Sequence, residues 1–120
     1  MLINGIHYER GLIIDSPWIG YILTGIKTWE MRKTKTKVRG RIALIQKGTG
    51  TVVGTADLTD SLEPLSDTEL ASTFNYHQVD YSCTPEAKAW VTPWVLDNVT
   101  KLDTPIPYTH KQGAVIWVKI

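Results

Sequence analysis

Three charged side chains of alternating sign lie within six residues of the sequence and could form a small ligand site. Lys27 follows Gly25, and Glu30 and Arg32 fall on one face of an extended chain, about 6–7 Å apart. The two cations could hold a phosphate or a polarised carbonyl, and the carboxylate could orient them or accept from the amino group of a base. The spacing predicts that Lys27, Glu30 and Arg32 line the main cleft.

The same three residues also allow a purely structural role. A partly buried ion network at a helix–strand junction would fix the joint without binding anything, and such networks can be close to neutral in energy. The residue types alone leave both interpretations open.

Aromatic residues near this segment could complete a binding site. Trp18 could stack on a base, as aromatic side chains do in single-strand sites, or it could belong to the core. Trp29 alternates with Glu30 and is expected in the core, as are Trp90, Trp94 and Trp117. A second aromatic group could wall a pocket or decorate a loop, and both options stay open. It consists of Tyr76, His77 and Tyr81.

The basic residues are unevenly distributed although the net charge is only +1. Eight of the thirteen Lys and Arg residues lie within residues 25–47, against one acid, Glu30, whereas residues 57–69 hold five acids and no base. The basic segment could be the footprint of a nucleic-acid surface, or a solvated loop balanced by the acidic segment. We expect four of its residues to contact a nucleic acid or ligand: Lys35, Lys37, Arg39 and Arg41.

The sequence gives little support to a metal site or a reactive thiol. His7, His77 and His110 are far apart and show no metal-ligand spacing, and Cys83 has no base nearby in the sequence. No phosphate-binding glycine loop is present. We therefore expect no metal and no cofactor.

Length and composition describe an ordinary globular domain. The chain has 120 residues, 42% hydrophobic and 21% charged, which excludes a disordered, collagen-like or coiled-coil protein. We expect one domain over residues 1–120. No apolar run is long enough to span a bilayer, no signal peptide is evident, and the single cysteine favours a reducing, cytoplasmic location without membrane contact.

Several elements must position the site. We expect a buried strand over residues 11–15, a short helix begun by Ser16 and Pro17 and ended by Gly25, and a strand over residues 27–32. Further strands are predicted over residues 42–45, 51–58 and 113–120, with another beginning at residue 94; Gly54 could mark a bulge. Ser66 and Glu69 form a capping box that opens a helix through about residue 74. A loop over residues 75–85 and one helical turn near residues 84–86 complete the prediction.

The count is five to six strands and two to three short helices. The simplest architecture is α+β, mostly β: a small, largely antiparallel β-barrel with peripheral helices, the 16–24 helix lying across one end. A parallel βαβ sheet fits poorly, because most connections are too short for a crossover helix.

These features resemble the ASCH domain family over roughly residues 11–120. The family pattern is a proline–aromatic helix start followed by Gly-x-Lys-x-x-Glu-x-Arg, and every fixed position of the latter is filled, from Gly25 to Arg32. Agreement extends to further segments: residues 39–41, 54–58, 94–96 and 113–118. The resemblance implies a PUA-like barrel, a fold used mainly to bind RNA or modified nucleosides. We therefore expect single-stranded RNA or a modified nucleoside as the ligand, bound by Trp18, the Lys27–Arg32 group and the basic segment.

The resemblance also implies two enzymatic alternatives. Some family members are amidohydrolases that deacylate N4-acylated cytidine with a lysine, a threonine and a glutamate. Lys27 matches the lysine, Glu30 stands where the threonine belongs, and the glutamate has only a loose candidate in Glu69. A catalytic Lys27–Glu30 pair could activate water if Lys27 were neutral, which requires its pKa to fall by ~3, about 4 kcal/mol.

In that arrangement Arg32 would help to lower the pKa of Lys27 and Glu30 would oppose it. The second alternative is a ribonuclease that acts on single-stranded RNA. There Lys27 and Arg32 would supply the base and the phosphate contact, but no histidine pair supports it.

Overall fold

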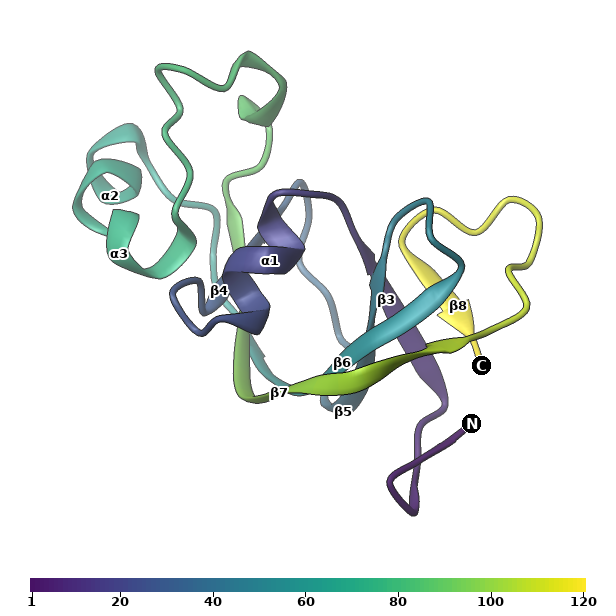
Figure 1. The fold of residues 1–120 in the computed structure, drawn as a ribbon. Helices are drawn as coiled ribbons and strands as arrows, with labels where there is room; N and C mark the ends of the chain where they lie inside the picture. The colour runs from purple at the N-terminus through teal and green to yellow at the C-terminus, as the bar shows by residue number, and fades with distance from the viewer.

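A six-stranded mixed sheet, curled into a half-barrel, forms the body of the molecule (Figure 1). The structure, a computed structural model, describes residues 1–120. The strand order is β4-β7-β6-β5-β3-β8. The strands are β3 (Arg10–Ile14), β4 (Trp29–Arg32), β5 (Gly40–Gln46), β6 (Thr51–Ser61), β7 (Thr92–Pro107) and β8 (Trp117–Lys119). A separate small hairpin joins β1 (Leu2–Ile3) to β2 (Ile6–His7).

Three short α-helices and one 3-10 turn accompany the sheet. They are α1 (Trp18–Leu23), α2 (Asp67–Ser72), α3 (Phe74–His77) and η1 (Pro85–Ala87). The last three belong to the long connection between β6 and β7, which forms a lobe beside the half-barrel (Figure 1). No helix is long and apolar enough to cross a membrane. The expected mostly-β architecture with peripheral helices is confirmed.

The pairing is antiparallel throughout the large sheet except between β3 and β5. These two strands run parallel, with Leu12 opposite Leu44 and Ile14 opposite Gln46, and the chain between them carries α1 and β4. One parallel pair therefore lies within a sheet that the sequence predicted to be mostly antiparallel. Its consequence is that the carboxyl ends of β3 and β5 lie side by side.

Alternation along β3 and β5 divides the apolar residues between two cores. Leu12 and Leu44 belong to one cluster, to which α1 adds Ile19 and Ile22, whereas Ile13 belongs to a second cluster on the other face of the sheet. The predicted packing of the 16–24 helix against the barrel is thus confirmed. The register of β5 on β6 shifts beside Gly54, where a bulge was predicted.

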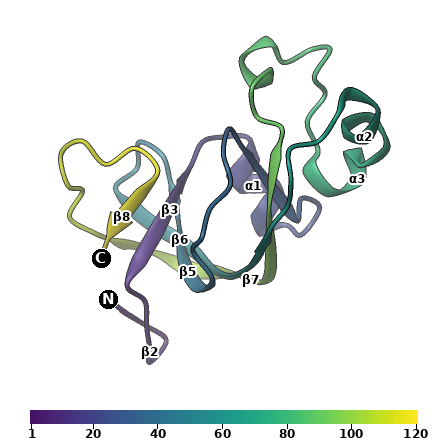
Figure 2. The ribbon, with the colours of Figure 1, turned by 180° about the vertical axis from the view of Figure 1, so that it is seen from behind.

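The segment between β4 and β5, residues 33–39, covers the side of the half-barrel that the sheet leaves open. Figure 2 shows it running between β3 on one side and β7 on the other. The indole nitrogen of Trp94 donates to the carbonyl of Thr34 at 2.8 Å, and the amide of Thr36 donates to the hydroxyl of Ser61 at 3.1 Å. These two bonds hold residues 33–39 against the point where β6 and β7 pair.

Some element ends differ from the sequence prediction. The N-cap of α1 is Pro17 rather than Ser16, and no side chain caps the helix. The capping box of Ser66 and Glu69 is confirmed, but α2 ends at Ser72 and a second helix, α3, occupies part of the expected loop. The final strand covers only residues 117–119 instead of 113–120. Val115 is 75% exposed, since the preceding residues form a surface loop.

Two glycines give a direct test of this packing. A Cβ at Gly54 would stand 2.6 Å from Leu23 Cδ2 and 2.8 Å from the carbonyl oxygen of Thr100, whereas a Cβ at Gly20 in α1 meets nothing within 4 Å. We expect Gly54→Ala to lower the free energy of unfolding by about 1–3 kcal/mol through overpacking. Gly20→Ala should raise it by about 1 kcal/mol through helix propensity. Urea unfolding of both variants measures these changes, and equal stability for the two would contradict the bulge geometry.

Candidate ligand-binding cleft

The junction between α1 and β4 places Lys27 inside the protein. Gly25 has a φ of +87°, a left-handed conformation that glycine adopts without strain, and its amide donates to the carbonyl of Ile22. The amide of Lys27 then donates to the carbonyl of Tyr21, so the chain turns back under the helix before β4 begins. The predicted glycine end of the helix is confirmed, and it aims the lysine side chain inward.

Lys27 is buried, with only 1% of the residue exposed. Its Nζ donates to the carbonyl oxygen of His77 at 2.6 Å and lies 3.8 Å from Oε1 of Glu30. The ammonium also sits 5.3 Å from the centre of the Trp18 ring, a cation–π distance. These contacts hold the charge in place within a largely apolar setting.

Burial lowers the pKa of Lys27 from 10.5 to about 8. Desolvation is the largest cause, and the neighbouring Arg32 cation acts in the same direction. The Glu30 carboxylate opposes both and keeps the lysine mostly protonated at neutral pH. The directions match those that the sequence predicted for Arg32 and Glu30.

Glu30 and Arg32 form a close pair that also bridges two strands. Oε2 of Glu30 accepts from Nη2 of Arg32 at 2.8 Å and from Nε at 3.2 Å. The same Nη2 donates to the carbonyl oxygen of Ile13 at 2.8 Å, which ties β4 to β3 across the open side of the half-barrel. The guanidinium lies 5.5 Å from the Trp94 ring centre. The ion network of the structural interpretation is therefore present, and Nη1 takes part in none of these bonds.

A cleft with a volume of about 170 Å³ opens above these charges. Its wall includes Lys27, Glu30 and Arg32, as predicted, together with Trp18. The remaining lining residues are Ile13, Asp15, Met31, Lys47, Val79, Trp90 and Val115. The charges of Lys27 and Glu30 lie at its floor because both side chains are buried, whereas Asp15, Lys47 and Val115 are exposed at its mouth.

The indole rings of Trp18 and Trp90 form part of the wall, edge to face with their centres 6.4 Å apart. Trp18 also packs against the core, which confirms one of the two roles considered for it; stacking on a base stays a prediction. Trp29 is only partly buried and stacks on Tyr76 at 4.6 Å, whereas Trp94 is fully in the core. Trp90 packs against a small core cluster in the lobe, as the sequence predicted, and its ring also lines the cleft.

The aromatic loop whose role the sequence left open supports the cleft from behind. The His77 ring is buried, accepts the Val79 amide on Nδ1 at 2.9 Å and places Nε2 2.8 Å from the carbonyl of Leu70. Burial lowers the pKa of His77, which favours the neutral ring that this pairing requires. The Tyr81 hydroxyl donates to the carbonyl of Trp90, and burial, followed by the charge of Glu30, raises its pKa to about 12. The His77 ring therefore holds in place the His77 carbonyl that binds Lys27, and Tyr81 holds Trp90 in the wall of the cleft.

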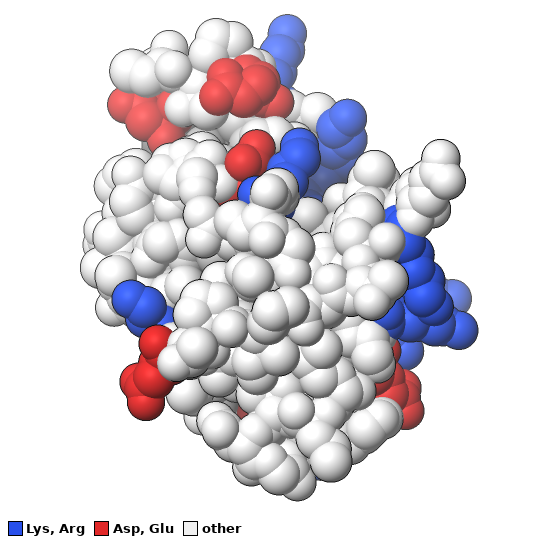
Figure 3. All heavy atoms as spheres, turned by 45° about the vertical axis from the view of Figure 1, so that its right-hand side comes forward, with Lys and Arg blue, Asp and Glu red and all other residues white.

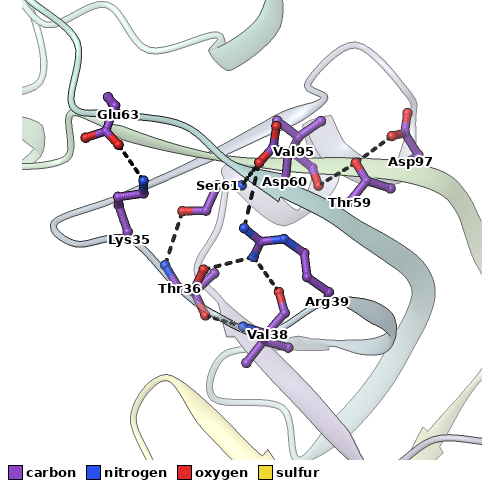
Figure 4. A network of polar contacts seen from close by, with 10 residues as sticks. All are labelled: Lys35, Thr36, Val38, Arg39, Thr59, Asp60, Ser61, Glu63, Val95 and Asp97. Carbon is purple, nitrogen blue, oxygen red and sulfur yellow. Dashed lines mark hydrogen bonds and ion pairs between the residues drawn. The ribbon is translucent and has the colours of Figure 1, made fainter.

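The remaining basic candidates do not line this cleft. Lys35 pairs with Glu63 at 2.5 Å and Arg39 with Asp60 at 3.7 Å, near the C-terminal end of β6 (Figure 4). Lys37, Arg39 and Arg41 line a separate, shallower groove. Arg10 and His7 line the same groove, and the sequence did not suggest them. The basic segment is therefore partly balanced by the acidic one, and on the face in Figure 3 the basic side chains form separate groups.

Asp15, Lys47 and Val115 were missed by sequence reasoning. A signal for the first two exists: each follows a buried apolar strand directly, and the parallel register of β3 and β5 makes the residues after those strands neighbours. The sequence alone does not show the parallel pairing, and therefore it does not show that Asp15 and Lys47 lie close together. Glu69, the loose candidate for a catalytic glutamate, lies outside the cleft and serves the α2 cap, where the Ser66 amide lowers its pKa. No three His, Cys, Asp or Glu side chains gather as a metal site.

Comparisons with known proteins agree on one family. The family model described as the ASCH domain matches residues 12–106. The crystal structure of ASCH from Zymomonas mobilis superposes with a TM-score of 0.70 at 15% identity, covering 93% of this chain and 87% of that one. Two mutants of that protein give TM-scores of 0.68 and 0.66 at 15% and 17% identity, covering 93% and 84% of this chain and 87% and 76% of theirs. No curated protein matches the chain.

The buried lysine predicts how stability depends on pH. Folding lowers the pKa of Lys27 from 10.5 to about 8, so between these values the unfolded chain binds more protons and the Lys27 contribution to stability rises with pH. The cost is fully present below pH 8 and is relieved by pH 10.5. We expect wild type to gain about 3 kcal/mol over Lys27→Met across this window, measured as the difference in free energy of unfolding.

The control for this measurement is Lys101→Met, which changes an exposed lysine on β7. Its difference from wild type should stay flat over the same window. A flat difference for Lys27→Met as well would mean that the ammonium is well solvated.

Proposed function

The chain belongs to the ASCH domain family, and on this premise we propose that its cleft binds a single base of an RNA strand or of a modified nucleoside. The observation that carries the proposal is the buried Lys27–Glu30 pair at the floor of a narrow cleft with indole walls. Each feature limits the ligand in a different way.

The size of the cleft favours one flat group. Sites for drug-sized ligands usually measure about 300–1,000 Å³, and this cleft measures about 170 Å³. A nucleobase can enter it, whereas the sugar and phosphate of the same nucleotide must remain at the mouth. The Trp18 and Trp90 rings provide aromatic surface against which a base can stack or pack edge-on.

The charges at the floor favour a base edge over a phosphate. Glu30 lies between the two cations, and a carboxylate this close would repel a phosphate dianion. A base edge instead offers carbonyl acceptors and amino donors side by side. Lys27 can donate to the carbonyl, and Oε1 of Glu30, which is only loosely paired at 3.8 Å, can accept from the amino group.

A longer strand would find its phosphate contacts in the separate basic groove. Lys37 and Arg41 line it and form no ion pair, in contrast with Lys35 and Arg39. We propose that the groove binds the phosphates of RNA nucleotides next to the one in the cleft. The phosphate contacts would then come mainly from Lys37 and Arg41 rather than from the whole basic segment.

A second candidate function has one observation in its favour. The pKa of Lys27 falls to about 8, so a fraction of the side chain is neutral near physiological pH. A neutral Lys27 could take a proton from water as that water attacks the acyl carbon of an N4-acylated cytidine. The tetrahedral intermediate would then release the cytidine amine, which takes the proton, and a carboxylic acid. Such an activity would rise with pH through about 8.

The cleft is tested by two conservative substitutions. We expect Lys27→Met and Glu30→Gln each to weaken binding of an RNA of about ten nucleotides by about tenfold or more, since each removes one charge-assisted hydrogen bond. Tryptophan fluorescence reports the binding, and Lys101→Met is the matched control. Unchanged affinity in both variants would contradict the proposal. Hydrolysis of N4-acetylcytidine by wild type and its loss in Lys27→Met would make the amidohydrolase the better description.

The basic groove is tested by the dependence of affinity on salt. If three to five phosphates are neutralised, the logarithm of the affinity should fall against that of the salt concentration with a slope of roughly −2 to −3.5. Lys37→Gln and Arg41→Gln should each make that slope shallower by about 0.7, whereas Lys101→Gln should not. An RNA affinity that changes neither with salt nor with these substitutions would contradict the proposed groove. That result, or the absence of RNA binding, would favour a protein-interaction module instead.

A further inference from the structure

We propose that Asp15 and Lys47 at the mouth of the cleft recognise the sugar and phosphate of the bound nucleotide, so that the cleft selects ribonucleotides over deoxyribonucleotides. In this arrangement Asp15 accepts a hydrogen bond from a ribose hydroxyl, and Lys47 binds the adjoining phosphate. The inference rests on the proposed binding of a base in the cleft and names the sugar that accompanies it.

The burial of the lining charges sets the depth of each contact. The side chains of Lys27 and Glu30 are 1% and 6% exposed, whereas those of Asp15 and Lys47 are 63% and 65% exposed. All four line the same cleft. A base that reaches Glu30 at the floor therefore leaves its sugar at the level of Asp15 and Lys47.

The parallel strands hold these two residues in fixed positions. The amide of Lys47 donates to the carbonyl of Ile14 at 2.9 Å, directly before Asp15. Oδ1 of Asp15 accepts from the amide of Ser16 at 2.9 Å, which orients the carboxylate. Neither backbone needs to move for a ligand to be bound.

The carboxylate of Asp15 and the ammonium of Lys47 lie close together but form no hydrogen bond with each other. Oδ2 of Asp15 lies 3.9 Å from Nζ of Lys47, beyond hydrogen-bond distance, and both side chains are well exposed. An exposed ion pair of this kind contributes little to stability, at most about 1 kcal/mol. Both groups can therefore exchange this contact for a ligand at small cost.

The pairing of a carboxylate with a lysine identifies the ligand group. A carboxylate repels a phosphate but accepts strongly from a hydroxyl, and in nucleotide sites an acidic side chain commonly binds ribose hydroxyls. A lysine is a good phosphate partner as a point charge. A hydroxyl next to a phosphate is what a ribonucleotide offers, and the 2′-hydroxyl is the group by which proteins distinguish RNA from DNA.

The test compares an RNA of about ten nucleotides with the DNA of the same sequence, uracil included, by fluorescence anisotropy. Wild type should prefer the RNA by about tenfold, the value of one hydrogen bond to a charged group. Asp15→Ala should lose most of that preference by weakening RNA binding while DNA binding stays equal or improves. Lys47→Gln should weaken both nucleic acids alike and make the salt slope shallower by about 0.7.

Two further variants keep the outcome interpretable. Asp15→Asn retains the acceptor for the Ser16 amide, so a reduced RNA preference in this variant cannot come from a changed loop. Asp103→Ala, which removes an exposed carboxylate from β7, should leave the preference unchanged.

Equal binding of RNA and DNA by wild type, or a preference that survives Asp15→Ala, would overturn the inference. If either result came with affinity that still depended on Lys27 and Glu30, the proposed base site would stand. Absence of binding to both nucleic acids would overturn the proposed function and the sugar recognition together.

Discussion

The guanidinium of Arg32 joins the two edges of an incomplete barrel, and the cleft depends on that junction. The sheet ends at β4 on one side and β8 on the other, and Arg32 on β4 donates to the Ile13 carbonyl on β3, next to β8. The same guanidinium fixes Glu30, which in turn faces Lys27. The residue that closes the barrel therefore also helps to build the floor of the cleft. A single short strand thus carries the charges that close the barrel and the charges that line the cleft.

Planar groups continue this junction along the interior of the barrel. Arg32 lies over Trp94, Trp94 stacks on Trp117 with ring centres 5.9 Å apart, and Arg10 lies over Trp117. The chain of contacts begins at the cleft and ends at the basic groove, which Arg10 lines. Such stacked groups combine apolar burial with cation–π attraction, so the barrel can carry a guanidinium at each end of its core. The two candidate sites are thus connected through the stacked rings of Trp94 and Trp117.

Local patterns in the sequence predicted several features of the fold and the cleft, because these features depend on residues that are close together in the chain. The glycine exit after α1, the capping box of Ser66, the bulge at Gly54 and the inward-facing Lys27–Arg32 group all follow from neighbouring residues. The features that the sequence did not predict depend on contacts between residues far apart in the chain. Whether β3 pairs parallel with β5, and so whether Asp15 meets Lys47, depends on the connection between them rather than on either strand. In the same way the extended 33–39 segment gave no sign that Trp94 and Ser61 would bind its backbone.

The contact between Lys27 and residue 77 spans 50 positions of the chain and uses a main-chain carbonyl as its acceptor. Any amino acid supplies that oxygen, but the buried His77 ring, bonded to Val79 and Leu70, holds the lobe in the path that presents it to the lysine. The charge of Lys27 therefore depends on the path of the lobe, and a change that displaces the lobe removes its hydrogen-bond partner even where Lys27 itself is unchanged.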